Sequence, residues 1–316
     1  MQYSYIRWNQ RLNHATNSFQ PRSVQESRAL PWGGMLIGDL RYAETYPNSY
    51  LDLYLHKDAK SIPHPTLFYV HGGGYTWGDK KDIYPFRGRK DHGWYVKAFM
   101  NAGYNIVSMD YALAPDYPYP TPIIQMCGAM AFVQHHAGDH GLDMRRVVLG
   151  GGSAGGNLIG QFANIQTNPS YAKEMGMEPV LQPGHLKAMV FNSALLDNER
   201  FGHTGVGWVD WMFRRCGQAY FHCEKLEGDA DVIQSCVIRH ASCAFPPSFI
   251  SDANWASFTD QALDFDERLS ELGVRHVLNI YPRSEARLFH GFESLASKHG
   301  KDNMEKTLDF LKEVVV

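Results

Sequence analysis

Several features that mark other protein classes are missing from this sequence. No apolar run approaches the roughly 20 residues that a membrane-spanning helix needs, so we expect no membrane span. Residues 1–8 lack the apolar segment and small-residue cleavage site of a signal peptide. We therefore expect a cytoplasmic location.

Strong charge bias is also missing. The 316 residues carry a formal net charge of -3, and no five-residue run of like charge occurs. Nucleic-acid-binding domains usually present a basic face, so we expect no nucleic-acid partner and, instead, a neutral small-molecule substrate. With 44% hydrophobic and 20% charged residues, the composition is that of an ordinary globular protein.

Cysteine is scarce and is not spaced as in metal sites. The chain has five cysteines, and in a sequence without a signal peptide an odd number favours reduced thiols. Four of them fall within one stretch: Cys216, Cys223, Cys236 and Cys243. No pair has the C-x2-C spacing of zinc ligands, and His136 and His140 on an expected helix end lack a third ligand. We expect no disulfide and no metal.

Short strand-like runs alternate with longer helical stretches through most of the chain. The expected strands are residues 50–55, 66–70, 105–109, 146–150, 188–192, 248–251 and 276–281. The expected helices are residues 121–136, 259–272, 292–313 and a segment beginning near residue 157. This alternation predicts an α/β fold with a mostly parallel central sheet of at least seven strands and helices on both faces. The first strand alternates polar and apolar residues and is expected to be half-exposed.

Two glycine-rich motifs directly follow expected strands. The first is His71-Gly72-Gly73-Gly74-Tyr75, whose glycine amides can face an oxygen that becomes negative during acyl transfer. The second is Gly151-Gly152-Ser153-Ala154-Gly155-Gly156, which fits the G-x-S-x-G nucleophile elbow between a strand and a helix. Small residues flank that serine because the sharp turn leaves little room for side chains. The two motifs together predict a serine-dependent acyl-transfer site.

Residues 201–245 interrupt the strand-helix rhythm and are rich in aromatic side chains. We expect this segment to be a lid or cap insertion, whose aromatic residues either line a substrate site or pack its helices on the sheet. Residues 1–45 are too few for a core of their own and are expected to form helix and loop beside the lid. The expected organisation is one domain over residues 1–316, and an exposed lid or edge strand would permit a homodimer.

Further motifs place the chain near a known superfamily. They are Gly78-Asp79-Lys80, Asp110-Tyr111-Ala112-Leu113-Ala114-Pro115 and His290-Gly291-Phe292. With the two glycine motifs, they make the chain resemble serine esterases of the α/β-hydrolase superfamily, in particular the lipases and esterases related to hormone-sensitive lipase and the feruloyl-esterase-like hydrolases. The resemblance covers about residues 49–313 apart from the insertion. It implies the α/β-hydrolase fold, with a mostly parallel central sheet of about eight strands, helices on both faces and a lid insertion.

The resemblance also implies roles for individual residues. Ser153 would be the nucleophile and His290 the general base, in the chain order serine, acid, histidine. The backbone amides of Gly73, Gly74 and Ala154 would form the oxyanion hole. Such a mechanism needs no cofactor.

The acid of the triad is where this sequence departs from the common pattern. Counting back from Gln261, the family's acid position holds Asn254, whereas Asp252 lies at the end of the preceding strand. An ionised carboxylate balances the charge of the imidazolium, and an asparagine only orients it. Asp252 is therefore the favoured acid and Asn254 the rival, while Asp260 is explained by the preference for acidic residues at a helix start.

The expected activity is hydrolysis of carboxylic esters of small or short acyl groups. Aromatic residues of the glycine loop, the insertion and the C-terminal region are candidates for substrate binding: Tyr75, Trp77, Trp208, Trp211 and Phe292. Two alternatives are an amidase resembling arylformamidases, which use a similar glycine loop, and a non-catalytic binding protein on a hydrolase scaffold.

Overall fold

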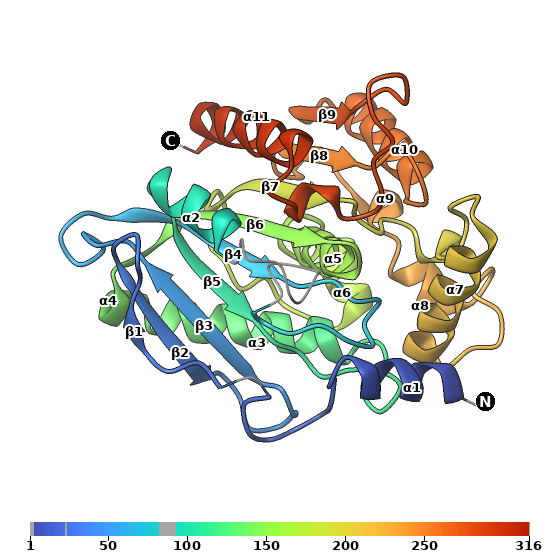
Figure 1. Ribbon diagram of the computed structural model, residues 1–316, viewed down its shortest axis with the longest axis horizontal. Helices are drawn as coiled ribbons and strands as arrows, with labels where there is room; N and C mark the ends of the chain where they lie inside the picture. Colours follow the sequence, from blue (N-terminus) through green and yellow to red (C-terminus); the bar gives the residue numbers. More distant parts are fainter. Residues whose placement is uncertain (1–2, 23, 82–92, 316) are drawn as a thin grey trace.

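The computed structural model describes residues 3–22, 24–81 and 93–315, and within them one nine-stranded sheet forms the centre of the protein (Figure 1). Its strands are β1 (Arg28–Ala29), β2 (Met35–Arg41), β3 (Tyr50–Leu55), β4 (His64–Val70), β5 (Asn105–Met109), β6 (Leu142–Gly152), β7 (Leu186–Asn192), β8 (Ser248–Asp252) and β9 (His276–Ile280). The strand order is β1-β2-β3-β5-β4-β6-β7-β8-β9. The strands from β5 to β9 in this order are parallel, and β1, β2 and β3 extend the sheet in antiparallel fashion.

Helices cover both faces of the sheet (Figure 1). The α-helices are α1 (Ser4–Leu12), α2 (Trp94–Asn101), α3 (Thr121–His135), α4 (Ala137–His140), α5 (Ala154–Thr167), α6 (Pro169–Met175), α7 (Gly207–Phe221), α8 (Ala230–Gln234), α9 (Val237–His240), α10 (Thr259–Glu271) and α11 (Lys298–Val314). Two 3-10 helices are η1 (Asn198–Arg200) and η2 (Phe292–Ser294).

The alternation of side chains along β4 explains the two layers. Leu67 and Tyr69 point into a core shared with α2 and α11. Phe68 and Val70 point into a larger core shared with α3, α5 and α10. Because successive strand residues face opposite sides, a continuous apolar run such as residues 66–70 is buried on both faces.

All seven strands expected from the sequence are present, and the mostly parallel sheet is confirmed. The sequence reasoning missed β1 and β2, which lie where helix and loop were expected. A register shift between Ile37 and Leu40 interrupts the two-residue period of β2, so its pattern is weak. The prediction that β3 is half-exposed was wrong, because all six of its residues are buried. Its polar residue Asp52 is accommodated by an ion pair with Lys80.

The helices expected at residues 121–136 and 259–272 are confirmed as α3 and α10. The helix expected over residues 292–313 was wrong at its start, because the short η2 comes first and α11 begins at Lys298. The side chain of Ser297 caps α11 by accepting a hydrogen bond from the Gly300 amide at 3.1 Å. This cap defines the N-terminus of the helix and separates it from η2.

The insertion between β7 and β8 holds α7, α8 and α9, and α1 lies beside α7 (Figure 1). Tyr5 of α1 meets Trp211 of α7 with ring centroids 4.6 Å apart. Asn164 of α5 donates to the carbonyl of Val237 at 3.1 Å, which ties the insertion to the helix behind the sheet. Within the described ranges, no helix is both long and apolar enough to cross a bilayer.

The parallel strands bring the expected site to one edge of the sheet. His71, Asp110 and Ser153 directly follow β4, β5 and β6. Asp252 ends β8, and His290 lies on the loop that follows β9. Ligands of open α/β sheets bind at this carboxyl edge.

Candidate active site

Ser153 occupies a sharp turn between β6 and α5. Its backbone dihedrals are φ 54° and ψ -123°, a conformation that a residue with a side chain rarely adopts. The turn is crowded, because a Cβ at Gly155 would lie 2.2 Å from the carbonyl oxygen of Val70. The strain and the crowding are those of a nucleophile elbow, in which the serine side chain is presented at the top of the sheet.

The glycine loop runs directly against this elbow. A Cβ at Gly72 would approach the Gly152 oxygen to 2.8 Å and the Ser153 Cβ to 3.2 Å. Gly73 has φ 93°, and a Cβ there would lie 2.2 Å from the Trp77 oxygen, so a side chain at this position would displace the loop.

Two sets of backbone amides lie beside the serine. Within the described residues, the amides of Gly73 and Gly74 donate to no other group of the chain. Ala154 is the first residue of α5, where an amide has no partner inside its helix. Free amides beside a nucleophile are what an oxyanion hole requires.

A buried tyrosine and histidine hold the start of the glycine loop. The hydroxyl of Tyr111 donates to the carbonyl oxygens of His71 and Gly72, each at 3.0 Å. The His71 ring stacks on Tyr111 with centroids 4.2 Å apart. Burial lowers the pKa of His71 to about 3, so the ring is neutral and packs the loop.

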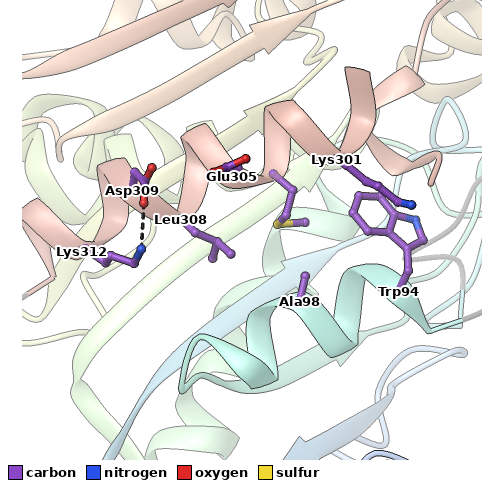
Figure 2. A pocket seen from close by; sticks show the side chains of 8 residues that line it. Trp94, Ala98, Lys301, Glu305, Leu308, Asp309 and Lys312 are labelled. Atoms are coloured by element: carbon purple, nitrogen blue, oxygen red, sulfur yellow. Dashed lines mark hydrogen bonds and ion pairs between the residues drawn. The ribbon is translucent and has the colours of Figure 1, made fainter. Parts of the chain in front are cut away.

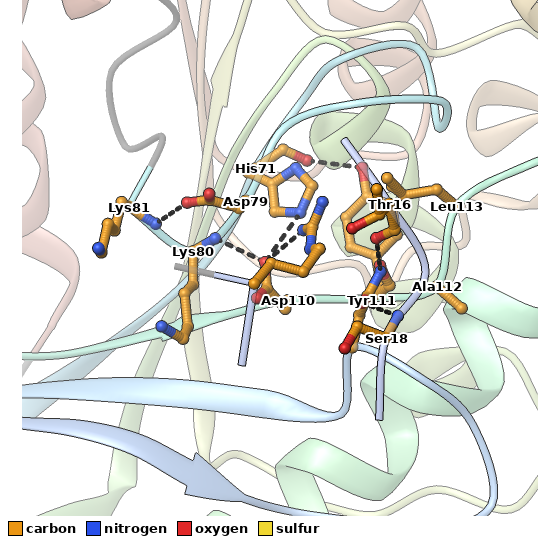
Figure 3. A network of polar contacts seen from close by, with 12 residues as sticks. Thr16, Ser18, His71, Asp79, Lys80, Lys81, Asp110, Tyr111, Ala112 and Leu113 are labelled. Carbon is orange, nitrogen blue, oxygen red and sulfur yellow. Dashed lines mark hydrogen bonds and ion pairs between the residues drawn. The ribbon is translucent and has the colours of Figure 1, made fainter. Parts of the chain in front are cut away.

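Buried ion pairs continue from His71 below the loop (Figure 3). Figure 3 shows Asp110 facing His71, with Oδ1 3.8 Å from the histidine Nε2. The same oxygen accepts from Arg22 Nη2 at 2.8 Å and from the Lys80 amide at 2.7 Å. Lys80 Nζ pairs with Asp39 at 2.7 Å and with Asp52 at 3.1 Å. Burial nevertheless raises the pKa of Asp110 to about 6, against the opposing effect of Arg22.

We call this group the loop-side network. Its members are Arg22, Asp39, Asp52, His71, Lys80, Asp110 and Tyr111. It includes Lys80 of the Gly78-Asp79-Lys80 motif and the first two residues of the motif that begins at Asp110, and through Tyr111 it supports the glycine loop.

His290 lies among aromatic rings on the opposite side of the site. Its ring is 5.3 Å from that of Phe213 of α7 and 5.1 Å from that of Phe258, both edge-on. Burial among these rings lowers the pKa of His290 to about 4, which favours the neutral imidazole that a general base requires. No hydrogen bond joins Ser153 Oγ to His290 within the described residues, and such contacts often tighten only when substrate binds.

Asn254 and Asp252, the rival candidates for the acid, differ in their surroundings. The Asn254 amide group donates to the carbonyls of Tyr281 and Ala286, and its Oδ1 accepts from the Leu288 amide at 3.0 Å. All its polar atoms are therefore used to hold the loop that precedes His290.

Asp252 is connected to the histidine through a serine. Ser257 Oγ donates to Asp252 Oδ1 and lies 2.8 Å from His290 Nδ1. Sequence reasoning missed Ser257, because a serine in the loop after β8 matches no motif. Asp260, which was assigned to the helix start, pairs with Arg200 at 3.1 Å near the start of α10.

A second buried carboxyl, Glu293, accompanies Asp252. Its oxygens accept from Ser193 Oγ at 2.8 Å and 3.0 Å and from Ser251 Oγ at 3.0 Å. Burial raises the pKa of Glu293 to about 7. Burial, and secondarily the charge of Glu293, also raise the pKa of Asp252 well above its ordinary value.

We call this second group the histidine-side network. Its members are Ser193, Ser251, Asp252, Ser257, His290 and Glu293. Glu293 was also missed from the sequence, since an acidic residue after the His290-Gly291-Phe292 motif has no signal of its own.

The five aromatic residues expected to bind substrate are not gathered at one place. Tyr75 is fully buried and stacks on Tyr220 of α7 with centroids 3.7 Å apart. Phe292 is buried in a small cluster with Tyr281. Trp77 is half-buried and donates its amide to the Gly73 carbonyl.

The insertion reaches the site through other side chains. Trp208 and Trp211 are 61% and 49% exposed, on the outer surface of α7. The inner surface of α7 carries Cys216, whose Sγ would lie 3.0 Å from a Cβ at Gly74. The adjacent Phe213 contacts His290. Two positions along a helix correspond to a rotation of about 200°, so Phe213 faces the side of α7 opposite to Trp211. The aromatic content of the sequence did not show which of these residues faces the site.

Among the described residues, no group of three or more His, Cys, Asp or Glu side chains is placed to hold a metal ion.

A groove lies away from the site, between α2 and α11. It has a volume of about 330 Å³, and in it Trp94 and Ala98 face Leu308 (Figure 2). None of the expected site residues lines it.

Comparison with known proteins agrees with this geometry. The family described as having the α/β hydrolase fold matches residues 67–293. Carboxylesterase NlhH of Mycobacterium tuberculosis is 32% identical over 238 residues, which cover 73% of this chain and 67% of that protein. The putative α/β hydrolase R526 of Acanthamoeba polyphaga mimivirus is 29% identical over 121 residues, 37% of this chain. The chain spans about a third (32%) of the length of that relative and of two others, an esterase and a lipase.

Solved structures extend the likeness to nearly the whole chain. Esterase B from Lactobacillus rhamnosis has a TM-score of 0.69 at 19% identity and covers 98% of this chain and 93% of its own. An esterase from the archaeon Pyrobaculum calidifontis has a TM-score of 0.67 at 20% identity, covering 89% and 86%. Together with the family match, the elbow and the glycine loop identify the chain as a member of the α/β-hydrolase family.

Proposed function

We propose that this protein is a carboxylic-ester hydrolase that forms an acyl-enzyme on Ser153. One observation carries the proposal: the strained Ser153 elbow lies against a glycine loop whose Gly73 and Gly74 amides are unused by the chain. A nucleophile and free donors side by side match the needs of a tetrahedral intermediate. The carboxylesterase named above supports the same reaction class.

The mechanism follows from the placement of these groups. His290 takes the proton of Ser153 as the serine oxygen attacks the ester carbonyl carbon. The resulting oxyanion is stabilised by the amides of Gly73, Gly74 and Ala154, and collapse releases the alcohol, which is protonated by His290. Water, activated by the same histidine, then releases the acid. Asp252 is the proposed acid of the triad, because the polar atoms of Asn254 are occupied elsewhere.

The acyl group is proposed to be small or short. Phe213 and Phe258 flank His290, and Phe201 lies 5.3 Å from Phe213, so apolar rings crowd the site. Such walls favour apolar groups of limited size. A cytoplasmic location and a homodimer stay predictions.

The test is hydrolysis of p-nitrophenyl esters from acetate to dodecanoate by the native chain and by Ser153→Ala. We expect activity on the short esters, a loss of about 10³-fold or more in Ser153→Ala, and fluorophosphonate labelling of the native chain alone. Equal activity of both proteins would contradict the proposal. An N-formyl aryl amide in the same panel tests the amidase alternative, and failure of both substrates and label would favour a binding protein.

A further inference from the structure

The connection between the acid and the base of this site passes through one hydroxyl. Ser257 Oγ lies 2.8 Å from His290 Nδ1 and also donates to Asp252 Oδ1. In the usual triad the carboxylate itself accepts the Nδ1 proton. Here no hydrogen bond within the described residues joins Asp252 directly to His290, and Asp252 Oδ2 is buried without a partner there.

The direction of the hydrogen bonds follows from the second donor to Asp252. The Ala253 amide donates to the same oxygen, Asp252 Oδ1, at 2.6 Å. An oxygen that receives an amide proton is an acceptor, whichever protonation state the carboxyl has at Oδ2. The single proton of the Ser257 hydroxyl is therefore directed to Asp252.

This direction determines the tautomer of His290. With its own proton given to Asp252, Ser257 Oγ can only accept from the imidazole, so Nδ1 carries the proton and Nε2 has a free lone pair. Nε2 is the atom that must take the proton of Ser153. The opposite tautomer would place a proton on Nε2 and block this step.

We propose that Ser257 is a positioning residue that holds His290 in the tautomer with its proton on Nδ1. Its hydroxyl donates to Asp252 and is thereby left to accept the Nδ1 proton of His290. The inference rests on the proposed function, since it assigns the base role to His290. Ser257 acts through His290 and does not touch the reacting atoms. The side chain is 5% exposed, so water has little access to take its place.

The kinetic test compares Ser257→Ala with Ser248→Ala. Ser248 is a matched control, because it is a buried serine beginning β8 whose hydroxyl donates to a carbonyl, that of Pro246, at 2.9 Å. Loss of a hydrogen bond that orients a reactive imidazole should lower kcat, since the misoriented fraction of histidine is inactive. On a short p-nitrophenyl ester we expect Ser257→Ala to lose about 10- to 100-fold in kcat with little change in KM. Ser248→Ala should stay within about twofold of the native chain.

The tautomer itself is measured by NMR on protein labelled with ¹⁵N-histidine. The spectrum of His290, assigned by its loss in His290→Gln, should show a protonated Nδ1 and an unprotonated Nε2 in the native chain at neutral pH. In Ser257→Ala the Nε2-protonated form should become populated. A merely structural serine would lower stability without changing this signature.

The outcomes separate this inference from the proposed function. An inactive native chain that fluorophosphonate does not label would overturn the proposed function. An active native chain with Nε2-protonated His290 would overturn the role of Ser257 alone, without any variant. So would a Ser257→Ala variant with the kcat of Ser248→Ala and an unchanged His290 spectrum.

Discussion

Two buried polar networks flank Ser153, and they differ in how their carboxyl groups are partnered. The loop-side network contains two cationic side chains, Arg22 and Lys80, for its three aspartates. The carboxyls of the histidine-side network, Asp252 and Glu293, have no Lys or Arg ion pair among the described residues and are held by serine hydroxyls.

This difference matches the positions of the two networks: the loop-side network holds the glycine loop, and the histidine-side network contacts His290. Ion pairs with Arg and Lys compensate the burial of charge and give a fixed arrangement, which suits a loop whose backbone must not move. Hydroxyls can donate or accept, so Ser193 and Ser251, which surround Glu293, can follow a change in the protonation of that carboxyl. The pKa of Glu293, about 7, places such a change near neutral pH. A network that orients a proton-transferring base benefits from this adaptability.

The sharpest way to test the histidine-side network is to remove its acid. Asp252→Ala should lower kcat/KM on a short ester by about 10⁴-fold, because His290 loses the acceptor at the end of the relay and also the carboxylate that balances the charge of the imidazolium. Asn254→Ala should cost far less turnover and instead lower the free energy of unfolding by about 1–3 kcal/mol through its lost loop hydrogen bonds. Steady-state kinetics and chemical denaturation of both variants measure the two effects. Full turnover in Asp252→Ala with none in Asn254→Ala would move the acid to Asn254.

The loop-side network should respond through stability. Lys80→Met leaves Asp39 and Asp52 without this buried cation, and we expect the free energy of unfolding to fall by about 3–5 kcal/mol. Urea denaturation measures it. The double variant Lys80→Met/Asp52→Asn is the control, since removing one of the stranded charges should restore part of the loss. If the free energy of unfolding of Lys80→Met lay within about 1 kcal/mol of the native value, the buried pairs would contribute no more than surface ion pairs do. The contrast between the two networks would then be wrong.

Glu293 offers a test through pH. Its pKa rises on folding from 4.5 to about 7, so between these values the folded protein keeps a proton that the unfolded chain has released. The stability associated with this group is therefore complete below pH 4.5 and is lost as pH rises through 7. Glutamine is neutral at every pH, so the Glu293→Gln variant lacks this loss. As pH rises through this window, the free energy of unfolding of the native chain should fall relative to that of the variant by on the order of 1 kcal/mol per pH unit. Parallel stability curves for the two proteins would show that Glu293 is not held neutral.

The smallest effect is expected at an ion pair that belongs to neither network. Lys312 pairs with Asp309 at 2.7 Å on α11, and both side chains are largely exposed beside the groove of Figure 2. Lys312→Ala should change the free energy of unfolding by about 0.5 kcal/mol or less and leave turnover unchanged. Thermal unfolding and the ester assay measure both. A loss comparable to that of Lys80→Met would show that burial does not distinguish these pairs.

The sequence predicted the parts of the molecule that depend on local pattern. Continuous apolar runs such as residues 66–70 identified the parallel strands, because a strand buried on both faces needs apolar side chains on both. The elbow at Ser153 and the glycine loop could be predicted because a tight turn and a close backbone approach leave no room for side chains, and such positions are therefore occupied by glycine. The bulged β2 and the capped start of α11 were misjudged, since an irregular period and a single serine are weak local signals.

What only the tertiary structure decided is which polar side chains meet. Asp252 and Asn254 are two residues apart and have side chains of the same length. The local sequence does not show which of them connects to a histidine almost forty positions later. Ser257 and Glu293 carry no motif, yet they complete the surroundings of His290. Hydrogen bonds between distant segments depend on how β8, β9 and the following loop pack, and this packing is set by the whole core rather than by the residues that form the site.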